Sequence, residues 1–286
     1  MIPHAIILGI VQGLTEFIPV SSSAHLVAIP NILGWRDMGL SFDVALHWGT
    51  LVALVVYFRR DWAAILSSFA RRSQPASSTT ATDAPHNVIL NGVKNLGRGR
   101  GMLIPLVIAC VPAALAGAFL EKKIEALRDW PRLIPTIACV LIGIGLVMLL
   151  AERIGKKRRR IDQMNRLDYA VIGIAQALAL FPGVSRSGVT ISAGLLRNLD
   201  RAAAARFSFL LSTPIVFGAG VYELAKLIGS GFPTAEAAPF AIGFHTSALF
   251  GYLAIRFLMS YLSRRPIDAF VTYRVCFAVV LLLASQ

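Results

Sequence analysis

Polar and ionisable side chains gather in a short segment near the start of an otherwise apolar sequence. The segment FIPVSSSAH, residues 17–25, ends on His25, and Gln12 and Glu16 precede it. Its hydroxyls are those of Ser21, Ser22 and Ser23. Gln12 and Glu16 are four residues apart, so they share one face of a helix. A carboxylate in an apolar segment is costly, which makes Glu16 a candidate functional residue, with a salt bridge to a buried arginine as the alternative. One of the serines is expected to cap the following helix.

A second polar segment, FPGVSRSGVT at residues 181–190, has the composition of a phosphate cradle. Its polar members are Ser185, Arg186, Ser187 and Thr190. Gly183 lets a ligand approach the backbone, and a helix that begins here would present free N–H groups to an anion. The Arg186 guanidinium offers a fork of donors that matches phosphate oxygens. Arg186 could instead neutralise Glu16, and one site can accommodate both roles.

The two segments together offer a carboxylate, an imidazole, hydroxyls and an anion cradle. These groups suit the hydrolysis of a phosphate ester or diphosphate, in which catalysis is mainly charge stabilisation and positioning, often with a divalent metal ion. Glu16, with Gln12 beside it, could hold such a metal or act as a base. For His25 the alternative is a hydrogen-bonded packing histidine, since a single histidine is weak evidence.

The composition places these residues in a membrane protein. Of 286 residues, 56% are hydrophobic and 15% are charged, whereas soluble domains have about 25% charged residues. A formal net charge of +13 would suggest nucleic acid in a soluble chain. In this apolar chain we expect the cations to lie in loops on one side of a membrane, which excludes a nucleic-acid-binding domain. Three cysteines without a CxxC pair support neither a disulfide framework nor a thiolate metal site.

Six apolar stretches approach the roughly 20 residues that a spanning helix needs. They are residues 43–58, 102–120, 132–151, 207–228, 239–261 and 268–284. Residues 3–34 and 168–198 are also apolar, but Pro, Ser and Gly interrupt each of them near its middle. Irregular backbone at membrane depth must be buried in protein or line a watery cavity. We therefore interpret both segments as re-entrant hairpins whose tips lie inside the membrane.

An internal repeat relates the two hairpins. Residues 9–23 and 173–187 match at eight of fifteen ungapped positions, where chance in so biased a composition gives about one or two matches. A weaker similarity pairs residues 105–117 with residues 239–251. The sequence offset between the paired segments is larger for the first pair than for the second, by about the length of the polar segment 71–101. We therefore interpret this segment as a flexible insertion in the first half.

Each half is then one hairpin followed by three spans, and because three is odd the second half enters from the opposite face. The sequence predicts an all-α polytopic membrane protein with an inverted-topology repeat, in a single domain over residues 1–286. Repeat one covers residues 1–151 and repeat two covers residues 168–286. Sites in such proteins lie where the halves meet near the midplane, so we expect the two tips to face one another.

The loops give this fold a direction across the membrane. Loops on one side carry 19 of the 28 Lys and Arg residues, and these loops are residues 59–101, 152–167, 197–206 and 262–267. By the positive-inside rule that side is cytoplasmic, and both termini face outward. Most of the cations would then set orientation, and Arg186 is the cation that we expect to contact phosphate.

Two motifs resemble the signatures of a known family. QGLTEFIPVSSSAHL, residues 12–26, resembles the [EQ]xxxE and PVSSSxH region of the bacterial undecaprenyl-diphosphatase, or bacitracin-resistance, family. FPGVSRSGVTIS, residues 181–192, resembles its PGxSRSxxT signature, and the similarity extends along the chain through residues 41–58 and 206–220. The resemblance implies removal of the terminal phosphate from undecaprenyl diphosphate at the outer face of the bacterial cytoplasmic membrane. It also implies recycling of the cell-wall lipid carrier, bacitracin resistance and a need for Mg²⁺ or Ca²⁺.

The resemblance also implies roles for individual residues. Glu16 and Gln12 match the acidic pair that could hold the metal, although many members have Glu where this chain has Gln12. Ser22 and His25 match the catalytic candidates of the first tip. The expected phosphate-binding residues are Ser21, Ser23, Ser185, Ser187 and Thr190. The nucleophile could be Ser22 activated by Glu16, His25 itself, or a metal-bound water. We favour Ser22, with Arg186 stabilising the transferred phosphoryl group and His25 protonating the departing lipid phosphate.

The rival function is a secondary transporter or lipid flippase, because discontinuous helices in inverted repeats are a transporter architecture. Arg186 facing Glu16 and Ser22 in one pocket would favour hydrolysis. The expected partners are a polyprenyl diphosphate lipid and the membrane, without nucleic acid, and a homodimer is one candidate assembly.

Overall fold

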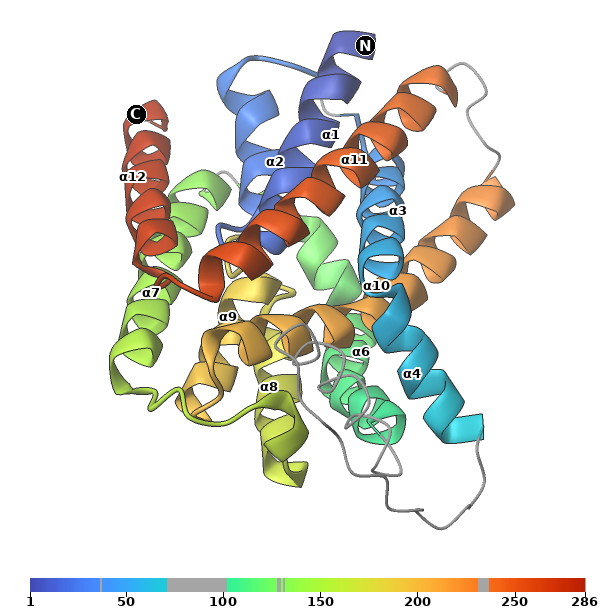
Figure 1. Ribbon diagram of the computed structural model, residues 1–286. Helices are drawn as coiled ribbons and strands as arrows, with labels where there is room; N and C mark the ends of the chain where they lie inside the picture. Colours follow the sequence, from blue (N-terminus) through green and yellow to red (C-terminus); the bar gives the residue numbers. More distant parts are fainter. Residues whose placement is uncertain (37, 71–101, 128–129, 131, 231–236, 286) are drawn as a thin grey trace, which may run out of the picture.

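The computed structural model describes residues 1–36, 38–70, 102–127, 130, 132–230 and 237–285, and within them the fold is all-helical. The expected insertion at residues 71–101 lies outside these residues. The first half contains α1 (Ile2–Phe17), α2 (Ser22–Ile32), α3 (Leu40–Tyr57), α4 (Arg59–Ala70), α6 (Leu103–Ala126) and α7 (Leu133–Ile154). After η2 (Ile161–Gln163), the second half contains α8 (Arg166–Leu178), α9 (Arg186–Leu196), α10 (Arg201–Ser230), α11 (Ala237–Leu262) and α12 (Asp268–Ala284). Both termini lie at the same end of the molecule (Figure 1).

Four of the described helices are long and apolar enough to cross a membrane, which confirms a multi-span protein. They are Leu103–Leu120, Leu133–Ile154, Arg201–Lys226 and Ala237–Leu262, and they correspond to four of the six expected spans. The expected span 43–58 is instead one limb of a bent pair, because α3 and α4 meet at 71°. Residues 59–70, assigned to a loop from their charges, form α4, whose polar first turn Arg59-Arg60-Asp61 follows the bend.

The expected span 268–284 forms a helix too short to count as a spanning helix by itself. It forms α12, whose 17 residues rise about 25 Å, less than the roughly 30 Å of a bilayer core. It is not among the helices long enough to cross unaided. Its first residue, Asp268, forms an ion pair with Arg153 of α7 at 3.1 Å, which joins the start of α12 to the end of α7.

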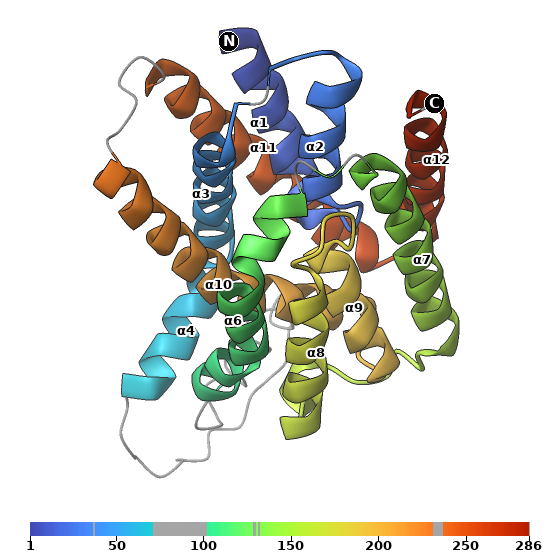
Figure 2. The ribbon, with the colours of Figure 1, turned by 180° about the vertical axis from the view of Figure 1, so that it is seen from behind.

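Two helix hairpins occupy opposite halves of the molecule. α1 and α2 form one hairpin, α8 and α9 form the other, and their tips approach each other at the centre in both views (Figures 1 and 2). The Gly183 amide of the second tip donates to Ser23 Oγ of the first at 3.4 Å. The Pro, Ser and Gly interruptions therefore mark the turns of the two hairpins, as the sequence predicts.

The second helix of each hairpin begins at a serine in the left-handed backbone region. Ser21 has φ 76° and Ser185 has φ 70°. Ser21 Oγ accepts from the Ala24 amide at 3.4 Å, and Ser185 Oγ accepts from the Gly188 amide at 3.2 Å. These contacts are the side-chain caps that satisfy a free N–H of a helix start. A non-glycine residue in this region is uncommon, and here it occurs at two positions that the sequence repeat aligns.

The first helix of each hairpin packs closely against a long helix of the other half. A Cβ on Gly9 of α1 would lie 2.9 Å from the carbonyl oxygen of Gly243 in α11. A Cβ on Gly173 of α8 would lie 2.4 Å from the carbonyl oxygen of Ala109 in α6. Small residues let helix backbones approach this closely in membranes. The repeat aligns Gly9 with Gly173 and Ala109 with Gly243, so the same packing occurs twice. In each case the first hairpin helix of one half contacts a long helix of the other half.

Three arginines tie the loop-bearing end together: Arg197 follows α9, and Arg201 and Arg206 lie in the first two turns of α10. The pairs are Arg197 Nε with Asp168 Oδ1 at 2.7 Å, Arg201 Nε with Glu152 Oε1 at 3.0 Å, and Arg206 Nε with Asp61 Oδ1 at 2.7 Å. The acids are buried and come from α8, α7 and α4. These cations, which the sequence analysis treats as setting orientation, therefore also join four elements.

Candidate active site

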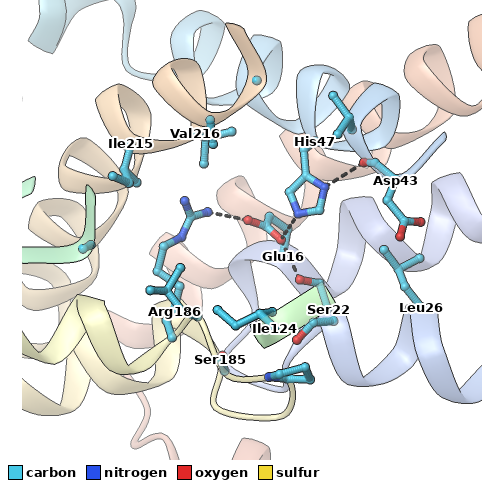
Figure 3. Close-up of a pocket in the computed structure, with 18 of the residues that line it drawn as sticks. Glu16, Ser22, Leu26, Asp43, His47, Ile124, Ser185, Arg186, Ile215 and Val216 are labelled. Atoms are coloured by element: carbon cyan, nitrogen blue, oxygen red, sulfur yellow. Dashed lines mark hydrogen bonds and ion pairs between the residues drawn. The ribbon is translucent and has the colours of Figure 1, made fainter. Parts of the chain in front are cut away.

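Glu16, in the last turn of α1, is the centre of the polar contacts between the two tips (Figure 3). Ser22 Oγ donates to Glu16 Oε2 at 2.6 Å, and Gln12 Nε2 donates to the same oxygen at 3.0 Å. Arg186, the first residue of α9, forms an ion pair with Glu16 Oε1. The prediction that the tips face one another is confirmed by this contact between the acid of one tip and the arginine of the other.

These residues line a pocket of about 410 Å³. Its polar lining consists of Glu16, Ser22, Ser23, Asp43, His47, Gln176, Ser185, Arg186 and Glu223. Aliphatic residues such as Leu26, Ile124 and Val216 complete the wall (Figure 3). An apolar cavity with a few convergent polar groups is the usual form of a binding site. This pocket suits a ligand with an anionic head and an apolar chain.

His47 of α3 is a pocket residue that the sequence analysis missed. Its Nε2 lies 3.7 Å from Glu16 Oε2, and its Nδ1 lies 2.7 Å from the Asp43 carbonyl oxygen. A carbonyl oxygen only accepts, so Nδ1 carries a proton and Nε2 faces the carboxylate. Asp43, one turn earlier, lines the same pocket. Asp43 and His47 are ionisable residues within an expected span, a signal that could have marked them as candidates. The contact of His47 with Glu16 itself depends on the packing of α3 beside α1.

The start of α9 divides its polar residues between the pocket and the interior. Ser185 and Arg186 line the pocket, whereas Ser187 and Thr190 are buried and are not among its lining residues. Ser187 Oγ lies 3.3 Å from Ser185 Oγ. Thr190 Oγ1 donates to the Arg186 carbonyl oxygen at 2.7 Å and lies 2.6 Å from Ser208 Oγ. Ser187 and Thr190 thus support the turn that carries Arg186.

The first tip shows a similar division. Ser22 and Ser23 line the pocket, whereas Ser21 is 1% exposed and caps α2. Ser23 Oγ lies 3.3 Å from Ser21 Oγ and accepts a hydrogen bond from the Gly183 amide of the opposite tip. Among the three consecutive serines, Ser22 alone contacts Glu16 within the described hydrogen bonds.

His25 does not join the other candidate residues in the pocket. Its Nδ1 lies 2.7 Å from the Ser21 carbonyl oxygen, and its Nε2 lies 2.8 Å from the Tyr273 hydroxyl. The ring stacks on Phe277 with centroids 4.1 Å apart, and the residue is 3% exposed. Both ring nitrogens are therefore engaged inside the protein, which matches the alternative of a packing histidine.

Arg274 of α12 is a second buried cation between the tips. It is 0% exposed. Its Nη1 donates to the Pro19 carbonyl oxygen of the first tip at 3.4 Å, and its Nη2 donates to the Gly183 carbonyl oxygen of the second tip at 2.8 Å. Its Nε donates to the Leu141 carbonyl oxygen of α7 at 3.1 Å. A buried charge needs such hydrogen bonds, and here they hold the backbone of both tips in place.

The donors near Glu16 determine what kind of metal site the pocket could form. Gln12 is buried outside the pocket, and its Oε1 has no hydrogen-bond partner among the described residues. The described part of the chain has no group of three His, Cys, Asp or Glu residues placed to hold a metal ion. Mg²⁺ is usually held by one or two carboxylates, waters and the phosphates of a substrate. Glu16 and Asp43, which line the same pocket, are therefore the carboxylates that could contact a cation entering with a diphosphate. The expected second ligand, Gln12, lies outside the pocket.

Comparisons with known proteins agree with this site. The family model described as "Bacitracin resistance protein BacA" matches residues 5–280. The undecaprenyl-diphosphatase of Geobacter metallireducens is 44% identical over 272 residues, which cover 95% of this chain and 93% of that protein. That of Desulforudis audaxviator is 44% identical over 283 residues, which cover 99% and 97%. That of Moorella thermoacetica is 42% identical over 279 residues, which cover 97% and 95%. The chain thus belongs to the bacitracin resistance protein BacA family.

Proposed function

We propose that the protein is a membrane phosphatase that hydrolyses undecaprenyl diphosphate to undecaprenyl phosphate and inorganic phosphate. This reaction recycles the lipid carrier of cell-wall synthesis and confers bacitracin resistance. The observation that carries the proposal is the convergence of Glu16, Ser22 and Arg186 in one pocket, with an acid and a hydroxyl from one tip and a guanidinium from the other. The relatives reported above carry the name of this activity.

The geometry supports Ser22 as the nucleophile. Ser22 Oγ already donates its proton toward Glu16 Oε2 at 2.6 Å, so Glu16 can accept that proton as Oγ attacks the terminal phosphorus. The bond from this phosphorus to the bridging oxygen breaks, and that oxygen leaves with its electron pair on undecaprenyl phosphate. Water then hydrolyses the phosphoserine, releasing inorganic phosphate and returning the Ser22 hydroxyl.

Arg186 and the start of α9 bind the charge that this reaction redistributes. Arg186, the first residue of α9, lines the pocket beside Glu16, where its guanidinium can contact the equatorial oxygens of the transferred group. The leaving group is a phosphate monoester whose second pKa is about 6, so it can depart without a proton from His25. Mg²⁺ or Ca²⁺ bound with the diphosphate would neutralise part of its charge.

We also propose that the two halves form an inverted-topology repeat with the basic loops in the cytoplasm. Three features support it: the hairpins lie in opposite halves, their serine caps match, and α1 and α8 pack alike on α11 and α6. Several pocket residues lie near the helix ends that are remote from the basic loops. They are Asp43 of α3, Ile124 of α6, Leu133 of α7 and Glu223 of α10. Such a pocket would face the outer side of a bacterial cytoplasmic membrane.

The experiment that tests the activity uses purified protein in detergent. Undecaprenyl or farnesyl diphosphate is added with Mg²⁺, with Ca²⁺ or with a chelator, and both inorganic phosphate and the lipid monophosphate are measured. We expect equimolar release of the two products. Failure to release phosphate under every metal condition would refute the hydrolase and leave the transporter or flippase alternative. Orientation is tested separately: a cysteine at Ser78, in a chain without its native cysteines, should resist an impermeant reagent in intact cells.

A further inference from the structure

A second cavity lies on the C-terminal part of α11 and the turn that follows it. It has a volume of about 510 Å³, and its lining includes Arg256, Arg264 and Arg265 beside Leu253 and Phe257. It shares no lining residue with the pocket at Glu16. All of its residues follow one face of α11 and the next turn, since positions three and four apart stack on a helix.

The three arginines have no acidic neighbour in the sequence around them and no carboxylate partner among the described residues. Residues 237–267 contain neither Asp nor Glu. In the part of the chain that the structure describes, none of the three guanidinium groups has a carboxylate partner. Asp268 and Asp61, on neighbouring elements, form ion pairs with other arginines, namely Arg153 and Arg206. Within the described part of the chain, the cavity therefore concentrates three positive charges that no carboxylate neutralises.

The apolar wall of the same cavity faces the surroundings of the protein. Leu253 is 44% exposed and Phe257 is 50% exposed. Because α11 is long and apolar enough to span a membrane, these side chains would face lipid. Arg256 is six residues before the end of α11, about 9 Å along the axis. From there its guanidinium can extend toward the headgroups while its stem stays among apolar groups. Tyr261, at the end of α11, adds an aromatic ring of the kind found at membrane interfaces.

We propose that this cavity binds the phosphate headgroup of an anionic phospholipid from the leaflet on the side of the basic loops. The three guanidinium groups supply forked donors to a phosphodiester, and the Ser260 hydroxyl at the cavity wall supplies another. Leu253 and Phe257 contact the acyl chain. Basic pockets beside transmembrane helices are known to hold such headgroups. Free phosphate shares the charge but lacks the chain that matches the apolar wall, which is why the cavity is assigned to a lipid.

The test measures lipid binding by the full chain, purified in dodecyl maltoside, by native mass spectrometry. The probe is palmitoyl-oleoyl phosphatidylglycerol, with palmitoyl-oleoyl phosphatidylcholine as the neutral comparison and inorganic phosphate as competitor. The test variant is Arg256→Gln/Arg264→Gln/Arg265→Gln. The matched control, Arg60→Gln/Arg158→Gln/Arg166→Gln, removes the same charge from exposed arginines outside the cavity. Arg256→Gln alone serves as a milder variant.

Each cation near a headgroup contributes about fivefold in affinity, so the triple variant should bind phosphatidylglycerol about 100-fold more weakly. Arg256→Gln should lose about fivefold, and the control should stay within about twofold of wild type. Equal binding by the triple variant and wild type would overturn the proposal, as would equal binding of the two lipids. Displacement by free phosphate at equal concentration would assign the cavity to phosphate instead. Hydrolysis of farnesyl diphosphate should be unchanged in the triple variant, and this readout separates the lipid site from the proposed phosphatase.

Discussion

Replacing Glu16 by Gln tests the role of the carboxylate at the meeting point of the tips. The substitution keeps the shape of the side chain and an oxygen that can accept from Ser22. It removes the negative charge that receives the Ser22 proton and that pairs with Arg186. A positioned general base contributes about 10²–10⁴-fold to a rate. We therefore expect kcat/KM to fall about 10³-fold, which corresponds to about 4 kcal/mol of transition-state stabilisation.

The chain contains a matched control for this experiment. Arg206 and Asp61 form an ion pair with side chains 17% and 10% exposed, and Arg186 and Glu16 form one with side chains 17% and 7% exposed. Asp61→Asn removes the same kind of carboxylate outside the pocket. Both variants should lower the thermal midpoint by similar amounts, because each leaves a half-buried arginine without its partner.

The assay is phosphate release from farnesyl diphosphate per folded molecule, with the folded fraction taken from a thermal melt of the same sample. Only Glu16→Gln should lose turnover. If Glu16→Gln keeps more than about a tenth of the wild-type kcat/KM, the carboxylate is not the base of a 10²–10⁴-fold step. If Asp61→Asn loses as much activity per folded molecule, the loss measured for Glu16 reflects helix packing and the reasoning fails.

Three further substitutions test other parts of the structure. Ser22→Ala should lower turnover at least about 100-fold with little change in the thermal midpoint, because its hydroxyl is part-buried and serves Glu16; near-normal phosphate release would exclude Ser22 as nucleophile. For Asp168, burial raises the pKa, but hydrogen bonds from arginines and a backbone amide outweigh it and hold the pKa below 3.8. The stability that Asp168 adds is therefore present above pH 3.8 and lost as the pH falls through the lower, folded value. Thermal midpoints measured from pH 7 to pH 3 should show Asp168→Asn less stable at pH 7 with a shallower acid loss, and parallel curves would contradict this. Gly49→Ala would place a Cβ 2.0 Å from Ser247 Oγ and should destabilise by about 1–3 kcal/mol, whereas Gly143→Ala, with nothing within 4 Å, should not; equal melts would refute the close packing.

The interrupted segments were the most informative part of the sequence. Pro, Ser and Gly within an apolar stretch have few physical interpretations at membrane depth, so the two hairpin tips were predicted at the correct residues. The repeat predicts that the two tips face one another, and the ion pair of Arg186 with Glu16 matches the neutralising contact that the sequence leaves open as an alternative. A serine cap is expected from the sequence for the first tip, where Ser21 provides it, whereas the cap by Ser185, a residue expected to bind phosphate, is not.

Other features depend on packing that one sequence does not encode locally. His47 faces Glu16 only because α1 and α3 both lie against α11, and no spacing rule connects residues on separate helices. The imidazole of His25 could serve in catalysis, but α2 directs this side chain toward Tyr273 and away from the pocket. The bend at Phe58 was missed because the charges after it suggest a loop, although they also form the polar first turn of α4.

The hydrogen bonds of Arg274 have a consequence for the order in which the protein matures. Arg274 lies on α12, which follows both hairpins in the chain, yet it holds the backbone of both tips. Until this helix inserts, the carbonyl oxygens of Pro19 and Gly183 have no guanidinium between them, and the pocket lacks its fixed geometry. The pocket therefore reaches its fixed geometry only after α12 has packed against the two hairpins, and a copy in which α12 is missing would lack this constraint on both tips.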